Sequence, residues 1–501
     1  MKKIKLNNEP KFEVKFEAFS YQAKAFEAVK NLEFAALFHE QGLGKTKIAI
    51  DLLLYWLEFK DIDTVLIVTK KQLVYNWENE FKLHTSIKPS ILTNNKSDNF
   101  YVFNGPARVV ITNFEVVSSE IERFKLYLKA RNVGIIIDES VKLKNPESKL
   151  TKSFFELSKL FKLRVIMTGT PVANRPYDIW SQIYFLDQGE SLGTNFYEFK
   201  KKIDLTNDLY KNYSKRTEFE KSASDIFKKI KWFSVRETKQ SGIVKLPNKE
   251  YIDIRAYFLP DQQILYNKVK DELIIEILRE GRVELDDTSA VLKRLLRLTQ
   301  VTSNPQLVTA ENIHSGKEEE LEKLIDKIMS SGEKCIVWSN FIKNIEQFTS
   351  KYKKFGAVKV HGKLSIEARN KAIEKFKTGE AKILFATPQA AKEGLTLTIA
   401  NHVIFYDRGF SLDDYLQAQD RIHRISQVKT CYIYNIMIKE SIDDWIDILL
   451  KAKQNAAFLV QGDITEEMYK KEIDYSFGDI IKKILGENEM GERDARKIND
   501  R

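Results

Sequence analysis

Short apolar runs alternate with longer amphipathic stretches along most of the chain. In the first half, runs without polar alternation predict strands at residues 34–38, 65–68, 108–111, 134–137 and 165–167. The second half repeats this rhythm at residues 335–338, 358–360, 383–386, 402–406 and 432–436. Such runs, separated by helical stretches, are typical of buried strands in a parallel sheet that helices cover on both faces. The pattern therefore predicts an α/β fold with two parallel-sheet domains.

The segment between the two sets of strands has a different pattern. Residues 182–315 are rich in lysine and helical periodicity and poor in strand signals, which favours helical insertions projecting from the α/β cores. We therefore expect four parts: a first domain at residues 1–235 with a helical insertion from about 182, an insertion and linker at 236–315, a second domain at 316–450, and a helical extension with a frayed tail at 451–501.

Composition narrows the class of protein. Of the 501 residues, 43% are hydrophobic and 30% are charged, which is typical of a globular chain with more than one domain. The first residues lack an apolar leader and no apolar run of about 18 residues occurs, so we expect a cytoplasmic protein without a membrane span. The two cysteines, Cys335 and Cys431, lie in apolar runs, which predicts buried thiols and argues against a disulfide framework or a cysteine zinc site.

A glycine loop follows the first predicted strand and precedes a helical stretch. Its residues are Gly42, Leu43, Gly44, Lys45 and Thr46. In a strand–loop–helix of this kind, backbone N–H groups and the helix N-terminus hold phosphate oxygens. Lys45 would reach the β- and γ-phosphates, and the Thr46 hydroxyl would bind Mg²⁺. His39 stands where the general pattern has glycine, so a plain tight turn remains an alternative on this motif alone.

Two adjacent acids, Asp138 and Glu139, end the predicted strand at residues 134–137. Ligands of open α/β sheets bind at the carboxyl ends of the strands, where these acids lie. Asp138 would hold Mg²⁺, and Glu139 would orient and deprotonate the attacking water. A solvated turn is the alternative, and the glycine loop at residues 42–46 makes the hydrolytic interpretation the stronger one.

A pair of arginines in the second half has the spacing of one helix face. Arg421 and Arg424 are three residues apart in a stretch that we predict to be helical. Such pairs usually lie on solvated faces. Here, however, an arginine supplied across a cleft between two domains would stabilise negative charge on the transferring γ-phosphoryl group.

In this order, the motifs resemble those of the SNF2 family of superfamily 2 motors, over roughly residues 15–450. Gln22 resembles the adenine-reading glutamine of such motors, which would favour ATP over GTP. Thr168, Gly169 and Thr170 resemble the motif that couples hydrolysis to movement. In the second half, the run at residues 360–362, the run at 393–397 with Gly394, and the run at 417–427 complete the series.

The resemblance implies two RecA-like domains, ATP and Mg²⁺ as cofactors, and a DNA-dependent ATPase that moves along double-stranded DNA. The Asp-Glu-Ser form of the acidic box, Arg175-Pro176 and Ala390-Ala391 are similar to the branch that includes annealing helicases. Val141 stands where the box usually has histidine, so the usual polar link to Thr168, Gly169 and Thr170 is expected to be absent. Lys70 stands where relatives commonly have proline, which suggests an added phosphate contact.

A net charge of +10 favours a polyanionic partner. By the resemblance, double-stranded DNA would be held through its phosphates, without sequence specificity, by a monomer with no known protein partner. The expected contacts are Lys70, Lys71, Thr112, Asn113, His361, Gly362, Lys363 and Thr387. Three alternatives stay open: a strand-separating or annealing helicase, a motor that works on RNA, and a nucleic-acid-binding scaffold with weak catalysis.

Overall fold

The computed structural model describes residues 8–204, 213–242, 246–279, 288–390, 396–424 and 426–472. The chain divides into two compact units. The first holds residues 1–203, 221–245 and 460–463, and the second holds residues 204–220, 246–459 and 464–501. The four-part division expected from the sequence stays a prediction.

The first unit contains a seven-stranded parallel sheet with the strand order β3-β4-β2-β5-β6-β1-β7. The strands are β1 (Phe34–Leu37), β2 (Thr64–Thr69), β3 (Ser90–Ile91), β4 (Val109–Asn113), β5 (Val133–Asp138), β6 (Leu163–Met167) and β7 (Ser234–Val235). All five strands predicted from apolar runs are present, and β3 and β7 are short additions. Since the strands are parallel, the carboxyl ends of β4, β2 and β5 lie side by side at one edge.

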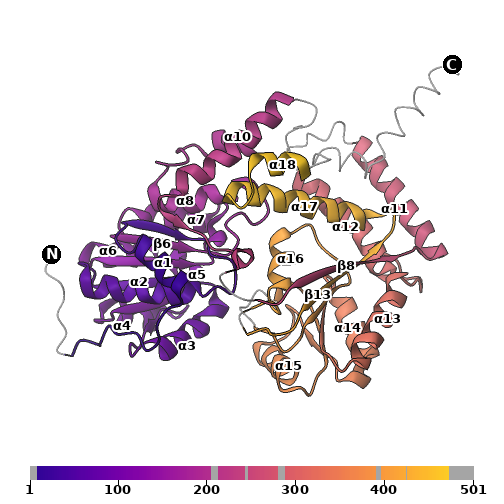
Figure 1. Cartoon of the computed structure of the whole chain (residues 1–501), viewed down its shortest axis with the longest axis horizontal. Helices are drawn as coiled ribbons and strands as arrows, with labels where there is room; N and C mark the ends of the chain where they lie inside the picture. Colours follow the sequence, from indigo (N-terminus) through magenta and orange to yellow (C-terminus); the bar gives the residue numbers. More distant parts are fainter. Residues whose placement is uncertain are drawn as a thin grey trace. The chain divides into compact units, whose positions relative to one another are not determined.

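Helices cover the faces of this sheet (Figure 1). The helices of this unit are α1 (Ser20–Val29), α2 (Lys45–Phe59), α3 (Val74–His84), α4 (Lys96–Asn104), α5 (Phe114–Ser119), α6 (Ile121–Ala130), α7 (Lys149–Ser158), α8 (Trp180–Asp187) and α9 (Phe196–Ile203). The next helix, α10 (Tyr213–Ile230), has residues in both units. The central helix α2 buries Trp56 against β5, where a Cβ on Gly134 would lie 2.9 Å from the indole ring. This close approach explains a glycine inside an otherwise β-branched strand.

The second unit contains a six-stranded parallel sheet with the order β10-β11-β9-β12-β13-β8. The strands are β8 (Lys249–Ala256), β9 (Cys335–Trp338), β10 (Val358–Val360), β11 (Ile383–Ala386), β12 (His402–Phe405) and β13 (Cys431–Ile438). The two parallel sheets confirm the expected pair of RecA-like α/β domains. Both cysteines are buried free thiols, as expected.

The strand β8 lies within residues 182–315, the segment that the sequence pattern described as helical and poor in strand signals. It pairs with β13 along its whole length (Figure 1). Because β8 is an edge strand, most of its side chains are exposed, and its sequence carries charges instead of an apolar run. The pattern that identified the buried strands was therefore missing here.

The remaining helices belong mainly to the second unit. They are α11 (Pro260–Arg279), α12 (Thr288–Ser303), α13 (Lys317–Ser330), α14 (Ile342–Lys351), α15 (Ile366–Thr378), α16 (Leu412–Gln419), α17 (Ile442–Gln461) and α18 (Glu466–Glu472). Among the helices that the structure describes, none is long and apolar enough to span a bilayer.

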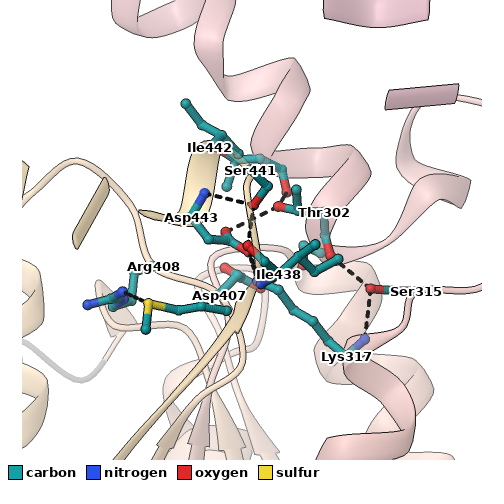
Figure 2. Close-up of polar contacts among 12 residues, drawn as sticks. Thr302, Ser315, Lys317, Asp407, Arg408, Ile438, Ser441, Ile442 and Asp443 are labelled. Carbon is teal, nitrogen blue, oxygen red and sulfur yellow. Dashed lines mark hydrogen bonds and ion pairs between the residues drawn. The ribbon is translucent and has the colours of Figure 1, made fainter. Parts of the chain in front are cut away.

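A buried network around one ion pair joins α12, α13, α17 and β13 in the second unit (Figure 2). Nζ of Lys317, at the start of α13, lies 2.7 Å from Oδ2 of Asp443 on α17, and the two side chains are 0% and 4% exposed. Thr302 of α12 donates to the other oxygen of Asp443, and the Ile438 backbone N–H donates to Oδ2. Buried charges need such partners, so this network fixes α12 and α13 against the sheet.

Candidate nucleotide site

The glycine loop lies between β1 and α2 in the first unit, as predicted. Gly42 and Gly44 have φ angles of 89° and 70°, a conformation that only glycine adopts without strain. A Cβ on Gly44 would lie 2.2 Å from Nε2 of Gln22, so the end of this α1 side chain packs closely on the loop. The result is a strand–loop–helix with α2 beginning at Lys45, the geometry of a phosphate-binding loop.

Lys45 folds back over the loop. Its Nζ donates hydrogen bonds to the carbonyls of His39 and Glu40 at 2.9 and 3.4 Å. A phosphate oxygen at this place would accept a stronger, charge-assisted hydrogen bond from the same ammonium. The His39 ring is 2% exposed. Burial, and then the charge of Lys45, lower its pKa to about 4, so the ring adds no charge to the loop at neutral pH.

Asp138 ends β5 and is held by two donors from neighbouring elements. Nε1 of Trp77 and Oγ1 of Thr69 donate to Oδ2 at 2.9 and 3.1 Å. Burial, and then the charge of Glu139, raise the pKa of Asp138 to about 6, while the hydrogen bond from Trp77 acts in the opposite direction. Both donors bind one oxygen, which leaves Oδ1 of the fixed carboxylate for a further ligand.

The donor set fits Mg²⁺. This cation prefers oxygen ligands, usually one or two protein oxygens with phosphate and water completing the shell. The Asp138 carboxylate is held rigidly at the carboxyl edge of the sheet, and the Thr46 hydroxyl lies in the first turn of α2 beside the glycine loop. These residues can therefore hold a magnesium ion together with the phosphates of a nucleotide.

Glu139 has an unusual backbone. Its φ is 55°, and a positive φ is uncommon for a residue other than glycine. In the described part of the chain, three residues other than glycine have a positive φ. Strained backbone of this kind is frequent at functional sites. Nζ of Lys70, the residue after β2, lies 3.6 Å from Oε2 of Glu139. The ammonium that was expected to contact DNA thus forms an ion pair with the expected catalytic base.

A polar bridge joins the acidic box to Pro171, the residue after the Thr168–Thr170 motif, and the expected absence of the usual link from the box to Thr168, Gly169 and Thr170 stays a prediction. Oγ of Ser140 donates to Oε1 of Gln182 at 2.8 Å, and Nε2 of Gln182 donates to the carbonyl of Pro171 at 2.7 Å. Gln182 is fully buried on α8. Its amide therefore provides this polar bridge, while Val141 packs in the interior.

The Thr168–Thr170 motif also packs on the glycine loop. A Cβ on Gly169 would lie 2.9 Å from the backbone nitrogen of Gln41. Thr168 is buried, and its hydroxyl accepts a hydrogen bond from the Thr170 N–H at 3.2 Å. A displacement of the glycine loop would therefore also displace the Thr168–Thr170 motif that packs on it.

Gln22 lies behind the loop instead of in open solvent. Its Oε1 accepts the Phe19 N–H at 3.0 Å, and its Nε2 lies 3.4 Å from the carbonyl of Leu43. The hydroxyl of Tyr21 donates to the same carbonyl at 3.1 Å. Gln22 thus supports the loop in this structure, and adenine reading by Gln22 stays a prediction.

The two arginines do not share a helix, which corrects that expectation. The helix α16 ends at Gln419, and Arg421 and Arg424 lie in the turn that follows. In this turn the Arg421 carbonyl accepts a hydrogen bond from the N–H of Leu397, a residue outside α16. Arg421 is fully buried, and Nη1 of Arg424 donates to Oγ1 of Thr396 at 2.7 Å. Their role toward the nucleotide stays a prediction, and Gly394 lies outside the described residues.

The expected DNA contacts of the first unit lie at the same edge of the sheet, at the ends of β2 and β4. Lys71 is exposed. Thr112 is buried, with its hydroxyl donating to the Leu92 carbonyl at 3.3 Å. Asn113 caps α5, because its Oδ1 accepts the Val116 N–H at 3.1 Å. Lys71 is thus the side chain most available for a phosphate.

In the second unit the expected DNA contacts follow β10 and β11. Lys363 is exposed, and a Cβ on Gly362 would meet nothing within 4 Å. His361 is 2% exposed, and burial lowers its pKa. Thr387 is mostly buried at the end of β11. Among the expected DNA contacts of the second unit, the loop at Gly362 and Lys363 is therefore the most accessible to a phosphate.

Sequence reasoning missed the supporting residues Thr69, Trp77, Gln182 and Arg236. Arg236 donates to the Phe38 carbonyl at 2.9 Å, just before the glycine loop, and to Asp463 at 2.6 Å. These residues lie far along the chain from the groups that they hold, and no local pattern marks them.

Comparison with known proteins identifies two matching family models. A model described as SNF2-related domain matches residues 28–307, and one described as helicase conserved C-terminal domain matches residues 316–426. An uncharacterized ATP-dependent helicase of Mycoplasma pneumoniae is 28% identical over 93% of this chain and 45% of its own length. The putative ATP-dependent helicase/translocase YwqA of Bacillus subtilis is 28% identical over 84% of this chain and 46% of its own. The chain thus spans about half the length of these relatives.

Among solved structures, the SWI2/SNF2 ATPase core of Sulfolobus solfataricus in complex with dsDNA is 23% identical, with a TM-score of 0.42. The alignment covers 94% of this chain and 99% of that chain.

Proposed function

Because this chain belongs to the SNF2-related family, we propose that it is an ATP-driven motor that moves along double-stranded DNA. One observation carries the proposal most directly. The glycine loop with Lys45 and the acids Asp138 and Glu139 all lie at the carboxyl edge of one parallel sheet. This is the edge at which open α/β sheets bind nucleotides.

The proposed roles follow from the geometry of the first unit. The backbone of residues 42–46 and the Lys45 ammonium bind the phosphates of ATP, while Thr46 and Asp138 hold Mg²⁺. When bound, Mg²⁺ neutralises charge on the phosphates. Glu139 orients the attacking water and takes its proton. The Gln22 amide reads the adenine edge, which favours ATP over GTP.

The second unit supplies positive charge to the reaction in this proposal. Arg421 and Arg424 stabilise the charge that develops on the γ-phosphoryl group, an effect worth about 10³ to 10⁵ in rate in comparable phosphoryl transfers. Since the contact between arginine and γ-phosphate ends with hydrolysis, the two units respond to the state of the nucleotide. Thr168, Gly169, Thr170 and Gly394 transmit that response.

Double-stranded DNA is the proposed track. The net charge of +10 favours such a polyanionic partner. Lys71, Thr112, Asn113, His361, Gly362, Lys363 and Thr387 are the proposed phosphate contacts, with Lys70 joining them as described below. Phosphate contacts carry no sequence information, so binding is expected to be nonspecific and to weaken steeply with salt. The working form is one chain in the cytoplasm.

A comparison of nucleic acids tests this function. ATP turnover is measured without nucleic acid and with single strands, duplex, forked DNA and RNA. The proposal expects the largest stimulation with duplex. Displacement of a triplex-forming strand without unwinding of a fork identifies a translocase, whereas fork unwinding or strand annealing identifies the helicase alternatives. A chain that binds duplex without any turnover is a scaffold, and that result contradicts the proposal.

A further inference from the structure

The ion pair between Lys70 and Glu139 joins two neighbouring strands of the first unit. Nζ of Lys70 lies 3.6 Å from Oε2 of Glu139, and the side chains are 20% and 15% exposed. Each residue directly follows its strand, Lys70 after β2 and Glu139 after β5, and these strands pair with Val68 opposite Ile137. The sheet therefore brings an ammonium to the proposed base, and the partial burial of both groups reduces screening of their attraction by solvent.

Both side chains of this ion pair can move. The backbone of Glu139 has a left-handed conformation at the start of the 3₁₀ turn η2 (Ser140–Leu143), while its carboxylate ends a side chain with rotatable bonds and can change direction. Lys70 has extended backbone, with φ −67° and ψ 144°, and carries its charge on a flexible four-carbon stem. The next residue, Lys71, is exposed at the start of η1 (Lys71–Leu73). A polyanion that approaches Lys71 thus meets an ammonium that can leave its carboxylate partner.

We propose that Lys70 is a positioning residue that holds Glu139 in an idle orientation until a DNA phosphate draws the ammonium away. This inference rests on the proposed function, because it assumes that Glu139 acts on the attacking water. It assigns Lys70 a role in restraining hydrolysis in the absence of DNA.

The physical basis is competition for one ammonium. A general base needs a carboxylate oxygen aimed at the water whose proton it accepts. The contact with Lys70 directs Oε2 of Glu139 toward β2. A DNA phosphate offers Lys70 a charge-assisted hydrogen bond comparable in strength with its ion pair to Glu139. Lys70 therefore gains one phosphate contact when the inhibitory contact with Glu139 is lost. Binding of DNA and activation of the base are then the same event.

The test measures steady-state ATP turnover of the full chain with and without a blunt duplex. In Lys70→Met, DNA-free turnover should rise about two- to fivefold, as expected for loss of one partly exposed ion pair. The DNA-saturated rate should stay near wild type, so the stimulation ratio falls by the same factor. The KM for ATP should not change, because Lys70 contacts the base and not the loop.

Three further variants sharpen the test. Lys70→Arg keeps the charge and should keep the low DNA-free rate. Lys70→Pro is the second uncharged variant in case Lys70→Met does not fold, because a φ of −67° suits proline. Lys125→Met removes a lysine on α6 that pairs with Glu122 and Glu156, and should leave DNA-free turnover unchanged.

Each outcome separates this inference from the proposed function. DNA-free turnover of an uncharged Lys70 variant that is equal to or below wild type overturns the inference. A rise that persists when Glu139→Gln is added also overturns it, since the effect would not pass through the base. If Glu139→Gln alone hydrolyses ATP normally, the proposed function itself fails.

Discussion

The indole of Trp77 on α3 donates a hydrogen bond to Oδ2 of Asp138 at the end of β5, with a distance of 2.9 Å. Trp77 is 2% exposed, and Thr69 donates to the same oxygen. A carboxylate that is held at one oxygen by two donors has little rotational freedom. The orientation of the proposed magnesium ligand therefore depends on a side chain 61 positions away in the sequence.

Removing this donor should weaken the response to magnesium. Trp77→Phe keeps an aromatic ring and loses the N–H. Since a hydrogen bond to a charged group contributes about 1.5–3 kcal/mol, we expect the concentration of Mg²⁺ that gives half-maximal ATP binding to rise roughly tenfold. The measurement is calorimetric titration of ATP at several magnesium concentrations.

Trp56→Phe is the matched control. Trp56 is also buried in the first unit, and its Nε1 has no hydrogen-bond partner among the described residues. An equal loss of magnesium response in both variants would show that aromatic packing, and not the hydrogen bond, positions Asp138.

The bridge through Gln182 should couple hydrolysis to movement. Gln182→Met keeps the length of the side chain and removes the hydrogen bonds to Ser140 and Pro171. We expect ATP turnover within about threefold of wild type, since none of the proposed nucleotide ligands is changed. The number of triplex-forming strands displaced per ATP hydrolysed should fall about tenfold. This factor corresponds to a coupling free energy of roughly 1.4 kcal/mol, the contribution of one strong hydrogen bond.

A control glutamine is Gln263 on α11, which bonds Asn267 at the surface. Gln263→Met should leave the ratio of displacement to hydrolysis unchanged. Parallel loss of turnover and displacement in Gln182→Met would instead assign Gln182 a general structural role.

The buried His39 should make the stability of the first unit depend on pH. Unfolded histidine titrates near pH 6.5, whereas burial and then Lys45 lower the pKa of His39 to about 4. Between these values the unfolded chain binds more protons than the folded chain, so stability is complete above pH 6.5 and is lost as the pH falls toward 4. The full effect corresponds to roughly 3 kcal/mol of unfolding free energy.

Urea unfolding followed from pH 7 to pH 4.5 measures this dependence. His39→Gln should flatten the curve over that range, whereas the exposed His314→Gln should follow wild type. Identical pH dependence in wild type and His39→Gln would mean that His39 does not remain neutral in the folded state.

The pair Lys317–Asp443 should show strong coupling in the second unit. Lys317→Met leaves a buried carboxylate without its cation, which should cost about 3–5 kcal/mol of unfolding free energy. Adding Asp443→Asn should recover most of that loss, because the uncompensated charge is removed. The exposed Lys323→Met, which breaks contacts to Glu319 and Glu320, should cost less than about 1 kcal/mol. Additive losses at Lys317 and Asp443 in urea unfolding would contradict a paired network.

The sequence was informative where a function or a buried strand depends on neighbouring residues. The apolar runs identified the central strands, and the loop at residues 42–46 and the acids at the end of β5 were recognisable from local pattern. The edge strand β8 was missed because exposure on its outer side removes the apolar run. The helix expected at Arg421 and Arg424 was wrong because α16 ends at Gln419, and the Arg421 carbonyl instead accepts the N–H of the distant Leu397.

Contacts that depend on strand order could not be predicted from local pattern. Lys70 lies 69 residues before Glu139, and their ion pair exists because β2 and β5 are neighbours in the sheet. Gln182 reaches Ser140 across 42 positions for a similar reason, since α8 packs beside η2. Such contacts can be predicted only when the order of the strands and the packing of the helices are known.

The decisive measurement is phosphate release from ATP by Glu139→Gln, with saturating duplex DNA, beside wild type and Lys45→Ala. Duplex should stimulate wild type, and both variants should stay folded and lose turnover by a factor of about 10² or more. Near-normal release by either folded variant would contradict the assignment of the catalytic site to this edge of the first sheet.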